Sequence, residues 1–194
     1  MPHALFRALD FTLALTGILL TLPLMLVITL VGLLDTGSPL FIQRRVGRHQ
    51  TPFILIKFRT MCRTTQSVGT HLVDTKSITK LGAFLRKTKL DELPQLFNVL
   101  LGQMSLVGPR PCLPNQEALI TERKSRGVFE ARPGITGLAQ IHQVDMSTPR
   151  KLARYDQLLA QRLSLNLYFQ ILIATLVGRG NGDRVKTNEQ ATPK

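Results

Sequence analysis

Two adjacent carboxylates, Asp91 and Glu92, are the side chains of this sequence best suited to act together in chemistry. Three cations stand close before them, Arg86, Lys87 and Lys89. An aspartate can attack phosphorus and form a covalent acyl phosphate, and carboxylates are the usual protein ligands of Mg²⁺. The same pair could instead complement the N-terminus of a helix, where acidic residues are favoured. An Asp-Glu dipeptide does not by itself decide between these interpretations.

Basic residues recur where phosphate chemistry would use them. Lys57 follows a strand-like apolar run, Arg86 precedes Asp91 by five residues, and Arg110 stands between two prolines. The prolines restrict the backbone on both sides of Arg110, so its guanidinium can be held in place. Arginine is suited to bidentate contacts with phosphate. Each of these cations alone is more often a solvated surface charge, and only their joint occurrence favours a phosphate site.

The composition indicates one basic domain that seeks polyanions. The 194 residues include 25 Lys and Arg against 12 Asp and Glu, which gives a net charge of +13. Nucleic acid, anionic lipid and nucleotide phosphates are all candidate partners. With two Tyr, no Trp and no nucleic-acid motif, we expect no nucleic-acid partner. A Gly-rich loop ending in Gly-Lys-Ser/Thr, which a Walker-type nucleotide hydrolase needs, is also missing. A membrane-anchored basic protein that binds anionic lipid or nucleic acid without catalysis stays as the alternative to an enzyme.

Cysteine and histidine do not indicate a metal centre. Cys62 and Cys112 are far apart and too few for a disulfide framework, which fits a reducing compartment. The four histidines are scattered, and no pair has the spacing of a zinc site.

An uncharged apolar segment covers residues 11 to 34, bordered by Asp10 and Asp35. As a helix it would be about 36 Å long, enough for a bilayer core of roughly 30 Å. Pro23 in its middle allows two topologies, a span with a kink or a broken helix that enters and leaves the same leaflet. Basic residues flank both ends, and the positive-inside rule then favours the cytoplasm for both.

The rest of the chain predicts a mostly helical α+β fold. Short strands are expected at residues 40 to 42 and 53 to 56, and a polar loop at 63 to 79. Helical spacing runs from 78 to 100 with Gly102 as a stop, and further helices are expected at 115 to 124 and 149 to 162. The uncharged segment 163 to 177 is short for a span and is expected in the core or on the membrane surface. The tail from 178 is basic, polar and expected to be disordered.

Longer motifs carry a resemblance. The sequence contains Gly37-Ser38-Pro39, KFRTM at residues 57–61, KLDELPQLFNVLLGQMSLVGPRP at 89–111 and ARPGITGLAQ at 131–140. These segments resemble the polyprenyl-phosphate sugar-1-phosphate transferases, the small monotopic phosphoglycosyl transferases of bacteria. The resemblance extends from about residue 5 to residue 177. It implies a membrane anchor at residues 1–36, a catalytic domain at 37–177 and a tail at 178–194.

The resemblance implies a two-step reaction. Asp91 would attack the β-phosphate of a UDP-sugar, release UMP and hold the phosphosugar until a polyprenyl phosphate, typically undecaprenyl phosphate, accepts it. Mg²⁺ would be held at Asp91 with Glu92 in support, and Lys57, Arg86 and Arg110 would bind phosphates. The resemblance also implies a re-entrant helix broken at Pro23, on the cytoplasmic face of the inner membrane and in contact with its lipids.

The sequence departs from the family pattern at several positions. Leu22 precedes Pro23 where serine is usual, and Gln103 stands where an acidic residue is common. Tyr168 and Gln170 replace the more usual Asp and Lys, and residues 142 to 147 also differ. The sugar, the glycan pathway (lipopolysaccharide or exopolysaccharide) and the oligomeric state, a homodimer included, stay open.

Overall fold

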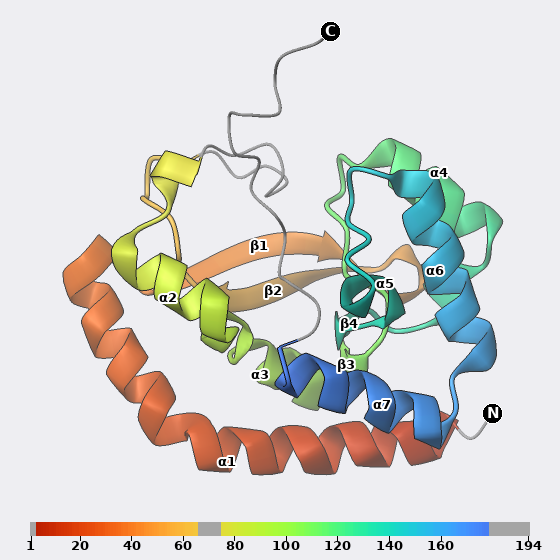
Figure 1. Ribbon diagram of the computed structural model, residues 1–194, viewed down its shortest axis with the longest axis horizontal. Helices are drawn as coiled ribbons and strands as arrows, with labels where there is room; N and C mark the ends of the chain where they lie inside the picture. Colours follow the sequence, from red (N-terminus) through yellow and green to blue (C-terminus); the bar gives the residue numbers. More distant parts are fainter. Residues whose placement is uncertain (1–2, 66–74, 179–194) are drawn as a thin grey trace, which may run out of the picture.

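The computed structural model describes residues 3–65 and 75–178, and their fold is the expected mostly helical α+β arrangement (Figure 1). The elements in chain order are α1 (His3–Thr36), β1 (Leu40–Val46), η1 (Arg48–Gln50), β2 (Pro52–Phe58), η3 (Thr75–Ser77), α2 (Lys80–Thr88), η4 (Leu90–Glu92), α3 (Gln95–Leu100), β3 (Ser105–Val107), α4 (Glu117–Ser125), η5 (Val128–Glu130), β4 (Gly134–Thr136), α5 (Leu138–Ile141), α6 (Pro149–Arg162) and α7 (Leu165–Leu176). The tail expected to be disordered lies, from residue 179 on, outside the described residues.

The apolar N-terminal segment forms one long helix, α1, which includes Pro23. Figure 1 shows α1 bent about midway along its length, and proline is the usual cause of such a bend. The helix continues through the proline, so the expected break is a bend and not an interruption of the helix. Just before it, the Thr21 hydroxyl donates to the Gly17 carbonyl (2.7 Å), a contact that often accompanies bending.

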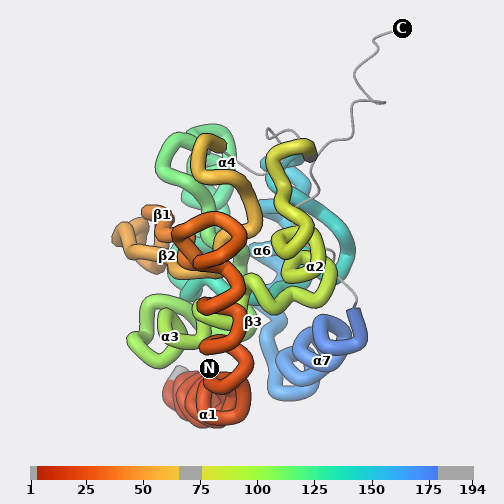
Figure 2. The backbone as a smooth tube through the Cα atoms, turned by 90° about the vertical axis from the view of Figure 1, so that its left-hand side faces the viewer, coloured from red at the N-terminus to blue at the C-terminus, as the bar shows by residue number. Residues whose placement is uncertain are grey.

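One side of α1 packs on the rest of the molecule and the other is apolar and exposed. Figures 1 and 2 show α1 running beneath α3 and α7. Its buried side chains include Ala14, Ile18, Met25 and Ile28. The exposed side carries fourteen large apolar side chains: Leu5, Phe11, Leu13, Leu15, Leu19, Leu20, Leu22, Leu24, Leu26, Val27, Leu30, Val31, Leu33 and Leu34. In the described part of the chain, α1 is the one helix that is long and apolar enough to cross a membrane.

The expected strands are confirmed and are longer than expected. β1 and β2 form an antiparallel hairpin whose register runs from the pair Leu40 and Phe58 to the pair Val46 and Pro52. A second pair was not expected: β3 and β4 are parallel, with Ser105 opposite Gly134 and Val107 opposite Thr136. The backbones meet so closely that a Cβ on Gly134 would lie 2.1 Å from the Gly108 nitrogen.

The single helical stretch expected at residues 78 to 100 is wrong. Helix α2 ends at Thr88, and Lys89 follows with a left-handed backbone (φ 59°). The short turn η4 comes next, and Pro94 then precedes α3. The apolar spacing is the same in a broken helix, because both pieces bury their apolar faces toward α1 and the hairpin.

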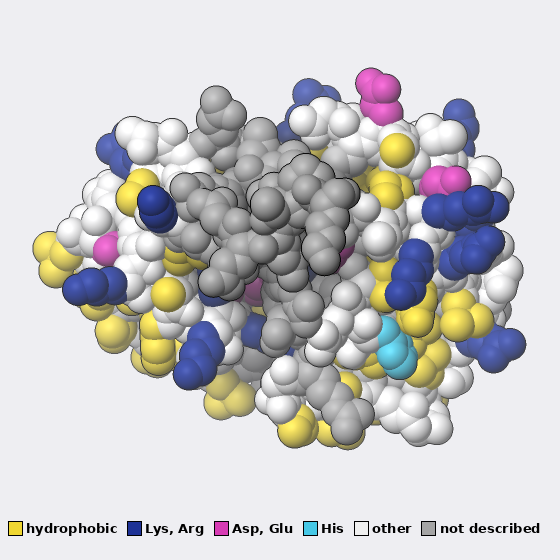
Figure 3. Space-filling model, turned by 45° about the horizontal axis from the view of Figure 1, so that its top comes forward, with side chains coloured by type: hydrophobic (Ala, Val, Ile, Leu, Met, Phe, Trp, Pro, Cys, Tyr) yellow, Lys and Arg dark blue, Asp and Glu magenta, His cyan; other side chains and the backbone are white. Residues whose placement is uncertain are grey.

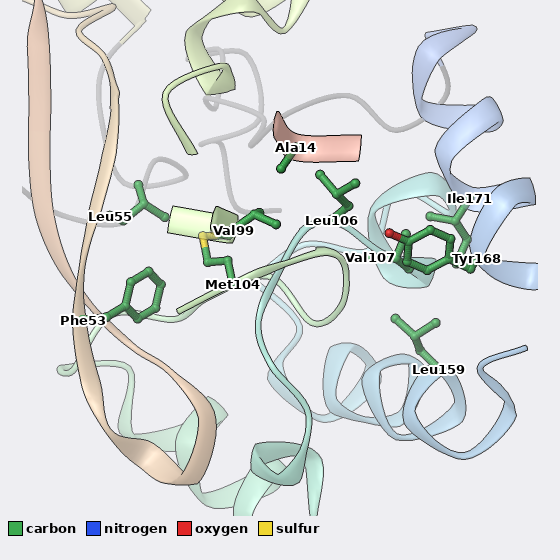
Figure 4. Packing of buried hydrophobic residues seen from close by; sticks show 10 residues of the cluster. All are labelled: Ala14, Phe53, Leu55, Val99, Met104, Leu106, Val107, Leu159, Tyr168 and Ile171. Carbon is green, nitrogen blue, oxygen red and sulfur yellow. The ribbon is translucent and has the colours of Figure 1, made fainter. Parts of the chain in front are cut away.

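The later helices agree with the sequence. Helix α6 occupies the expected residues, and α4 lies within two residues of its expected limits. Helix α7 divides its surface: Tyr168 and Ile171 are buried, whereas Leu165, Phe169 and Ile173 are exposed. Figure 4 shows Tyr168 and Ile171 beside Val107, with Leu159 of α6 pointing toward them. One face of this segment therefore belongs to the core, and its opposite face is apolar and uncovered.

Candidate active site

Asp91 lies in the turn η4 between two helices, and its side chain is buried. Lys89, with its left-handed backbone, ends α2, and Pro94 stands directly before α3. These two residues fix where the turn η4 begins and ends. A left-handed backbone is uncommon for residues other than glycine, and the few that adopt it cluster at functional sites. The Lys89 ammonium also donates to the Thr175 carbonyl at the end of α7 (3.3 Å). The turn is therefore tied to the apolar helix α7.

The carboxylate of Asp91 is surrounded by charges. Burial, and then the charge of Glu92, raise the pKa of Asp91 to about 6. Three cations act against this rise, Lys57 from β2, Arg86 from α2 and Arg110. No hydrogen bond from a described residue reaches the Asp91 carboxylate. All five residues predicted for the site are thus brought together, and Asp91 is left without a hydrogen-bond donor from the described chain.

Glu92 faces Arg110 directly. Its Oε1 accepts hydrogen bonds from both Nη1 and Nη2 of Arg110, each at 3.1 Å. Both side chains are mostly buried, with 19% of Arg110 and 16% of Glu92 exposed. The two adjacent carboxylates therefore differ: Glu92 orients a cation, whereas Asp91 faces cations without bonding to them.

Arg110 is carried on a segment whose carbonyls are fixed one after another. The carbonyls of residues 109, 110, 111 and 112 accept hydrogen bonds from, in order, the Gly134 amide (2.9 Å), Arg123 Nη1 (2.8 Å), Arg45 Nη1 (2.9 Å) and the Val46 amide (3.0 Å). The donors come from β4, α4 and β1, so separate elements hold this segment. The two prolines have no N–H to donate, so their part in these contacts is as acceptors through their carbonyls. The sequence predicted a held Arg110 from the prolines alone, and these donors supply the rest.

The donor on the Arg110 carbonyl belongs to a buried ion pair. Arg123 of α4 pairs with Asp156 of α6 (Nη2 to Oδ2, 2.7 Å; Nε to Oδ2, 2.9 Å), and both side chains are 2% exposed. Burial raises the pKa of Asp156, and the Arg123 charge acts in the opposite direction. Because Arg123 also binds the carbonyl of Arg110, the pair connects two helices to the segment that presents Arg110 to Glu92.

The protein-family model described as "Bacterial sugar transferase" matches residues 1–179. This chain belongs to the bacterial sugar transferase family. It is therefore an enzyme, and the alternative of a non-catalytic basic protein is not retained. Membership in this family and the long apolar helix α1 together indicate a membrane location for the transferase.

Several curated proteins are similar to this chain over most of its length. An uncharacterized sugar transferase, EpsL, of Bacillus subtilis (strain 168) is 41% identical, with 88% of this chain and 84% of the relative covered. A putative undecaprenyl-phosphate N-acetylgalactosaminyl 1-phosphate transferase of the same strain is 37% identical over 71% of this chain and 83% of its own length. A UDP-glucose:undecaprenyl-phosphate glucose-1-phosphate transferase of Xanthomonas campestris pv. campestris is 39% identical over 87% of this chain, but only 37% of its length is covered.

The donor set of this transferase fits Mg²⁺ only with help from a substrate. In residues 3–65 and 75–178 no group of three or more His, Cys, Asp or Glu side chains could hold a metal ion. Asp91 and Glu92 supply hard oxygen ligands, and a cation beside them would relieve the repulsion that raises the pKa of Asp91. Mg²⁺ is commonly held by one or two carboxylates, waters and substrate phosphates, so the two carboxylates suit an ion that arrives with phosphate.

Sequence reasoning missed the polar residues that hold the transferase together. In the sequence Asp10 borders the apolar segment, and in the structure its side chain is buried, 2% exposed. Its Oδ1 accepts hydrogen bonds from the Tyr168 hydroxyl (2.8 Å), the Ser105 hydroxyl (3.0 Å) and the Leu106 amide (2.9 Å). Burial and the nearby Asp10 charge raise the pKa of Tyr168. Tyr168, noted as a departure from the family pattern, thus fastens α7 to the start of α1.

Asn98 is a second residue without a sequence signal. It is 1% exposed, and its amide pairs with the edge of β2 by donating to the Ile54 carbonyl (2.7 Å) and accepting from the Ile56 amide (3.2 Å). It also donates to Oε1 of Gln103 (2.7 Å). Gln103 therefore has a structural contact with Asn98, and Asn98 itself fixes α3 on the hairpin.

Proposed function

We propose that this transferase moves a sugar-1-phosphate from a UDP-sugar to a polyprenyl phosphate, with undecaprenyl phosphate as the acceptor, and starts the assembly of a lipid-linked glycan. The names of two relatives support the proposal, since both include undecaprenyl phosphate and a sugar 1-phosphate transferase activity. The single observation that carries it here is a buried aspartate facing three cations without a hydrogen bond from the described chain.

In the first step, an Asp91 carboxylate oxygen attacks the β-phosphorus of the UDP-sugar. A bond forms between that oxygen and phosphorus, the bond from phosphorus to the bridging oxygen breaks, and UMP leaves with the electron pair. In the second step, a phosphate oxygen of the polyprenyl phosphate attacks the same phosphorus. Asp91 leaves as a carboxylate, and the product is a polyprenyl diphosphate sugar. Splitting one displacement into two in this way is nucleophilic catalysis.

The protein groups around Asp91 suit both steps. An acid with a pKa of about 6 is ionised at neutral pH and, since no donor of the described chain bonds it, its oxygens are open to act as a nucleophile. Lys57, Arg86 and Arg110 face the position where phosphate oxygens would gather negative charge, and preorganised cations stabilise such charge without rearrangement. Glu92 keeps the guanidinium of Arg110 in place. Mg²⁺ bound with the substrate between Asp91 and Glu92 would neutralise phosphate charge.

The membrane arrangement supports access to a lipid substrate. We propose that α1, with its bend and its apolar side, enters and leaves one leaflet on the cytoplasmic side of the inner membrane. The exposed apolar face of α7 would then rest on the same surface. Because Lys89 beside the active turn bonds the last turn of α7, the phosphate end of a membrane lipid would meet the site from that side.

The experiment that tests the function is UMP release from a panel of UDP-sugars by membranes that carry the protein, with and without undecaprenyl phosphate. With the acceptor present, we expect continuous release for at least one sugar. Without acceptor and with one equivalent of enzyme, we expect a single burst and a phosphosugar adduct on the peptide that contains Asp91. Release that depends on the acceptor with no adduct or burst would contradict the covalent step, and no release for any UDP-sugar would contradict the donor class.

Topology has its own test. In a Cys62→Ser background, His3→Cys and His49→Cys would be labelled with a membrane-impermeant reagent from each side. Cys112 is buried and stays silent. The re-entrant arrangement requires that both positions react from the cytoplasmic side, and labelling from opposite sides would overturn it.

A further inference from the structure

A cavity of about 110 Å³ lies between the start of α1, the end of α6 and the loops around β3 and β4. Three arginines line it, Arg7, Arg48 and Arg132. Neither Asp91 nor any of its cations is among the residues around it. We call it the arginine cavity.

The three arginines are close enough to repel one another. Burial lowers the pKa of Arg132, the charges of Arg48 and Arg7 lower it further, and the charge of Asp10 offsets part of this fall. Like charges around a small cavity with low-dielectric walls cost free energy unless an anion joins them. The backbone of β3 and the residues after it close one wall, since Val107, Gly108 and Pro109 line the cavity.

Each arginine is anchored by part of its guanidinium. Arg7 donates from both Nη atoms to the Val99 and Leu100 carbonyls (2.6 and 2.8 Å). Arg48 uses Nε on the Glu130 carbonyl (2.8 Å), and Arg132 uses Nε on the Gly102 carbonyl (3.0 Å). Within the described chain, no hydrogen bond uses the Nη atoms of Arg48 or Arg132. These two side chains are fixed at Nε and present their outer N–H groups, the fork that binds phosphate oxygens in pairs.

Two carboxylates share the cavity and do not neutralise it. Oδ1 of Asp10 is occupied by the three hydrogen bonds from Tyr168, Ser105 and Leu106. Glu130 is exposed at the edge, and its carboxylate lies 3.5 Å from Nδ1 of His49. Three positive charges against two negative ones leave the lining cationic.

The cavity borders the apolar surface. Phe6 of α1 and Leu163 before α7 line it, and their neighbours Leu5, Phe11 and Leu165 are exposed. A helix whose apolar side enters a bilayer places such a border at the level of the lipid headgroups.

We propose that the arginine cavity binds the phosphate group of an anionic ligand, either the headgroup of a membrane phospholipid or a free phosphate ion, separately from the Asp91 site. A phosphate would bridge the outer N–H groups of Arg48 and Arg132 beside the fixed charge of Arg7. It would connect the start of α1 to the segments that carry Arg48 and Arg132. The proposal does not depend on the reaction assigned above, because its readout is binding.

The test uses the full chain in dodecyl maltoside and counts bound ligand by native mass spectrometry. The probes are dihexanoyl phosphatidylglycerol, dihexanoylglycerol (the same chains without phosphate) and inorganic phosphate. We expect a phosphate-bearing probe to bind at least tenfold more weakly to Arg48→Gln and to Arg132→Gln than to the unmodified protein. Arg126→Gln is the matched control, since Arg126 forms a separate ion pair with Glu122 (2.9 Å). Binding must persist in Asp91→Asn, which separates this cavity from the catalytic site.

The outcomes distinguish a lipid headgroup from a free phosphate ion as the ligand. Tighter binding of phosphatidylglycerol than of phosphate, with dihexanoylglycerol inactive, assigns a lipid headgroup. Equal binding of both phosphate probes assigns a free phosphate ion. The proposal is overturned if neither probe binds, or if both arginine variants bind as the unmodified protein does. Arg132→Lys keeps the positive charge but loses the forked N–H groups, and it is the control for a folding defect. We expect it to unfold at the same temperature as the unmodified protein. Its affinity for the phosphate probe should lie between those of the unmodified protein and Arg132→Gln.

Discussion

Asp10 and Asp91 are both buried, but their surroundings differ. Asp10, 2% exposed, accepts three hydrogen bonds that join α1, β3 and α7. Asp91, 7% exposed, receives none from the described chain and is balanced only by nearby charges. A buried carboxylate with its bonds satisfied stabilises a fold, whereas one left unsatisfied costs stability. The difference separates a structural acid from one kept available for reaction, and proteins commonly accept such a cost at functional sites.

The largest effect on activity is expected from Asp91→Asn. We expect UMP release to fall at least about 1,000-fold, because an amide cannot serve as the nucleophile. We also expect the variant to be more stable than the unmodified protein at pH 7, by about 1–3 kcal/mol. The pKa of Asp91 is raised to about 6 from 3.8, so the folded carboxylate is penalised when ionised. The gain should be absent below pH 4, grow as the pH rises, and be complete above pH 6.

Rates of UMP release and thermal unfolding at several pH values measure both effects. Asp145→Asn is the control, since Asp145 does not act on Asp91 and caps a nearby turn through Ser147 (2.9 Å). Normal activity in Asp91→Asn would remove Asp91 as the nucleophile. A loss of stability in that variant would show that Asp91 is structural, as Asp10 is.

A second buried aspartate, Asp156, tests whether an ion-paired acid supports the active site from a distance. Asp156→Asn leaves the buried Arg123 without its partner charge, and such a loss costs about 3–5 kcal/mol. Because Arg123 also holds the Arg110 carbonyl, we expect kcat per folded molecule to fall about tenfold with a smaller change in KM. Glu122→Gln, which removes the partner of Arg126 on the same helix, should change stability by no more than about 0.5 kcal/mol and leave kcat unchanged. An Asp156→Asn protein with normal kcat would confine the pair to stability.

The structural acid itself, Asp10, should give a change in stability of the opposite sign to that of Asp91→Asn. Asp10→Asn keeps an oxygen for its three donors but loses the charge that strengthens those bonds, so we expect a stability loss of about 1–3 kcal/mol. Tyr168→Phe removes one donor and should cost about 1 kcal/mol. Activity per folded molecule should stay within about twofold in both. Denaturant unfolding measures the loss, and a stabilised Asp10→Asn would end the distinction between the two acids.

The sequence anticipated elements whose signal is local. Helix α6 follows from Pro149 at its first turn and from its apolar spacing, and the hairpin strands follow from short apolar runs bounded by turn residues. The pair β3 and β4 could not be foreseen, since each strand is three residues long and their partners are 29 residues apart. The left-handed backbone of Lys89 has no local signal, because its surroundings in the fold hold that conformation.

The candidate site shows the same division. Asp91, Glu92 and Arg110 were found from residue types and motifs. The residues that hold them were not, because a buried acid such as Asp10 or Asp156 looks like a surface charge until its partner is known. Asp10 meets its partners 95 to 158 residues further along the chain. Pro94 was a usable sign that a new helix begins, because proline has no N–H for the hydrogen bond of a helix interior but fits a helix start.

The charge of Asp91 should set the pH dependence of UMP release. The nucleophile must be ionised, and burial with the charge of Glu92 raises the pKa of Asp91 to about 6. At limiting UDP-sugar, kcat/KM for UMP release reports the free enzyme, so it should be half-maximal near pH 6 and fall about tenfold for each unit below, a difference of about 1.4 kcal/mol per unit. Glu92→Gln removes the like charge and should move the midpoint to lower pH. Arg110→Gln removes a cation that lowers the pKa of Asp91 and should move it to higher pH. Activity must return on readjustment to pH 7.5, which excludes acid unfolding as the cause. Shifts of the same sign in the two variants would mean that Glu92 and Arg110 act on Asp91 through its position and not through its charge.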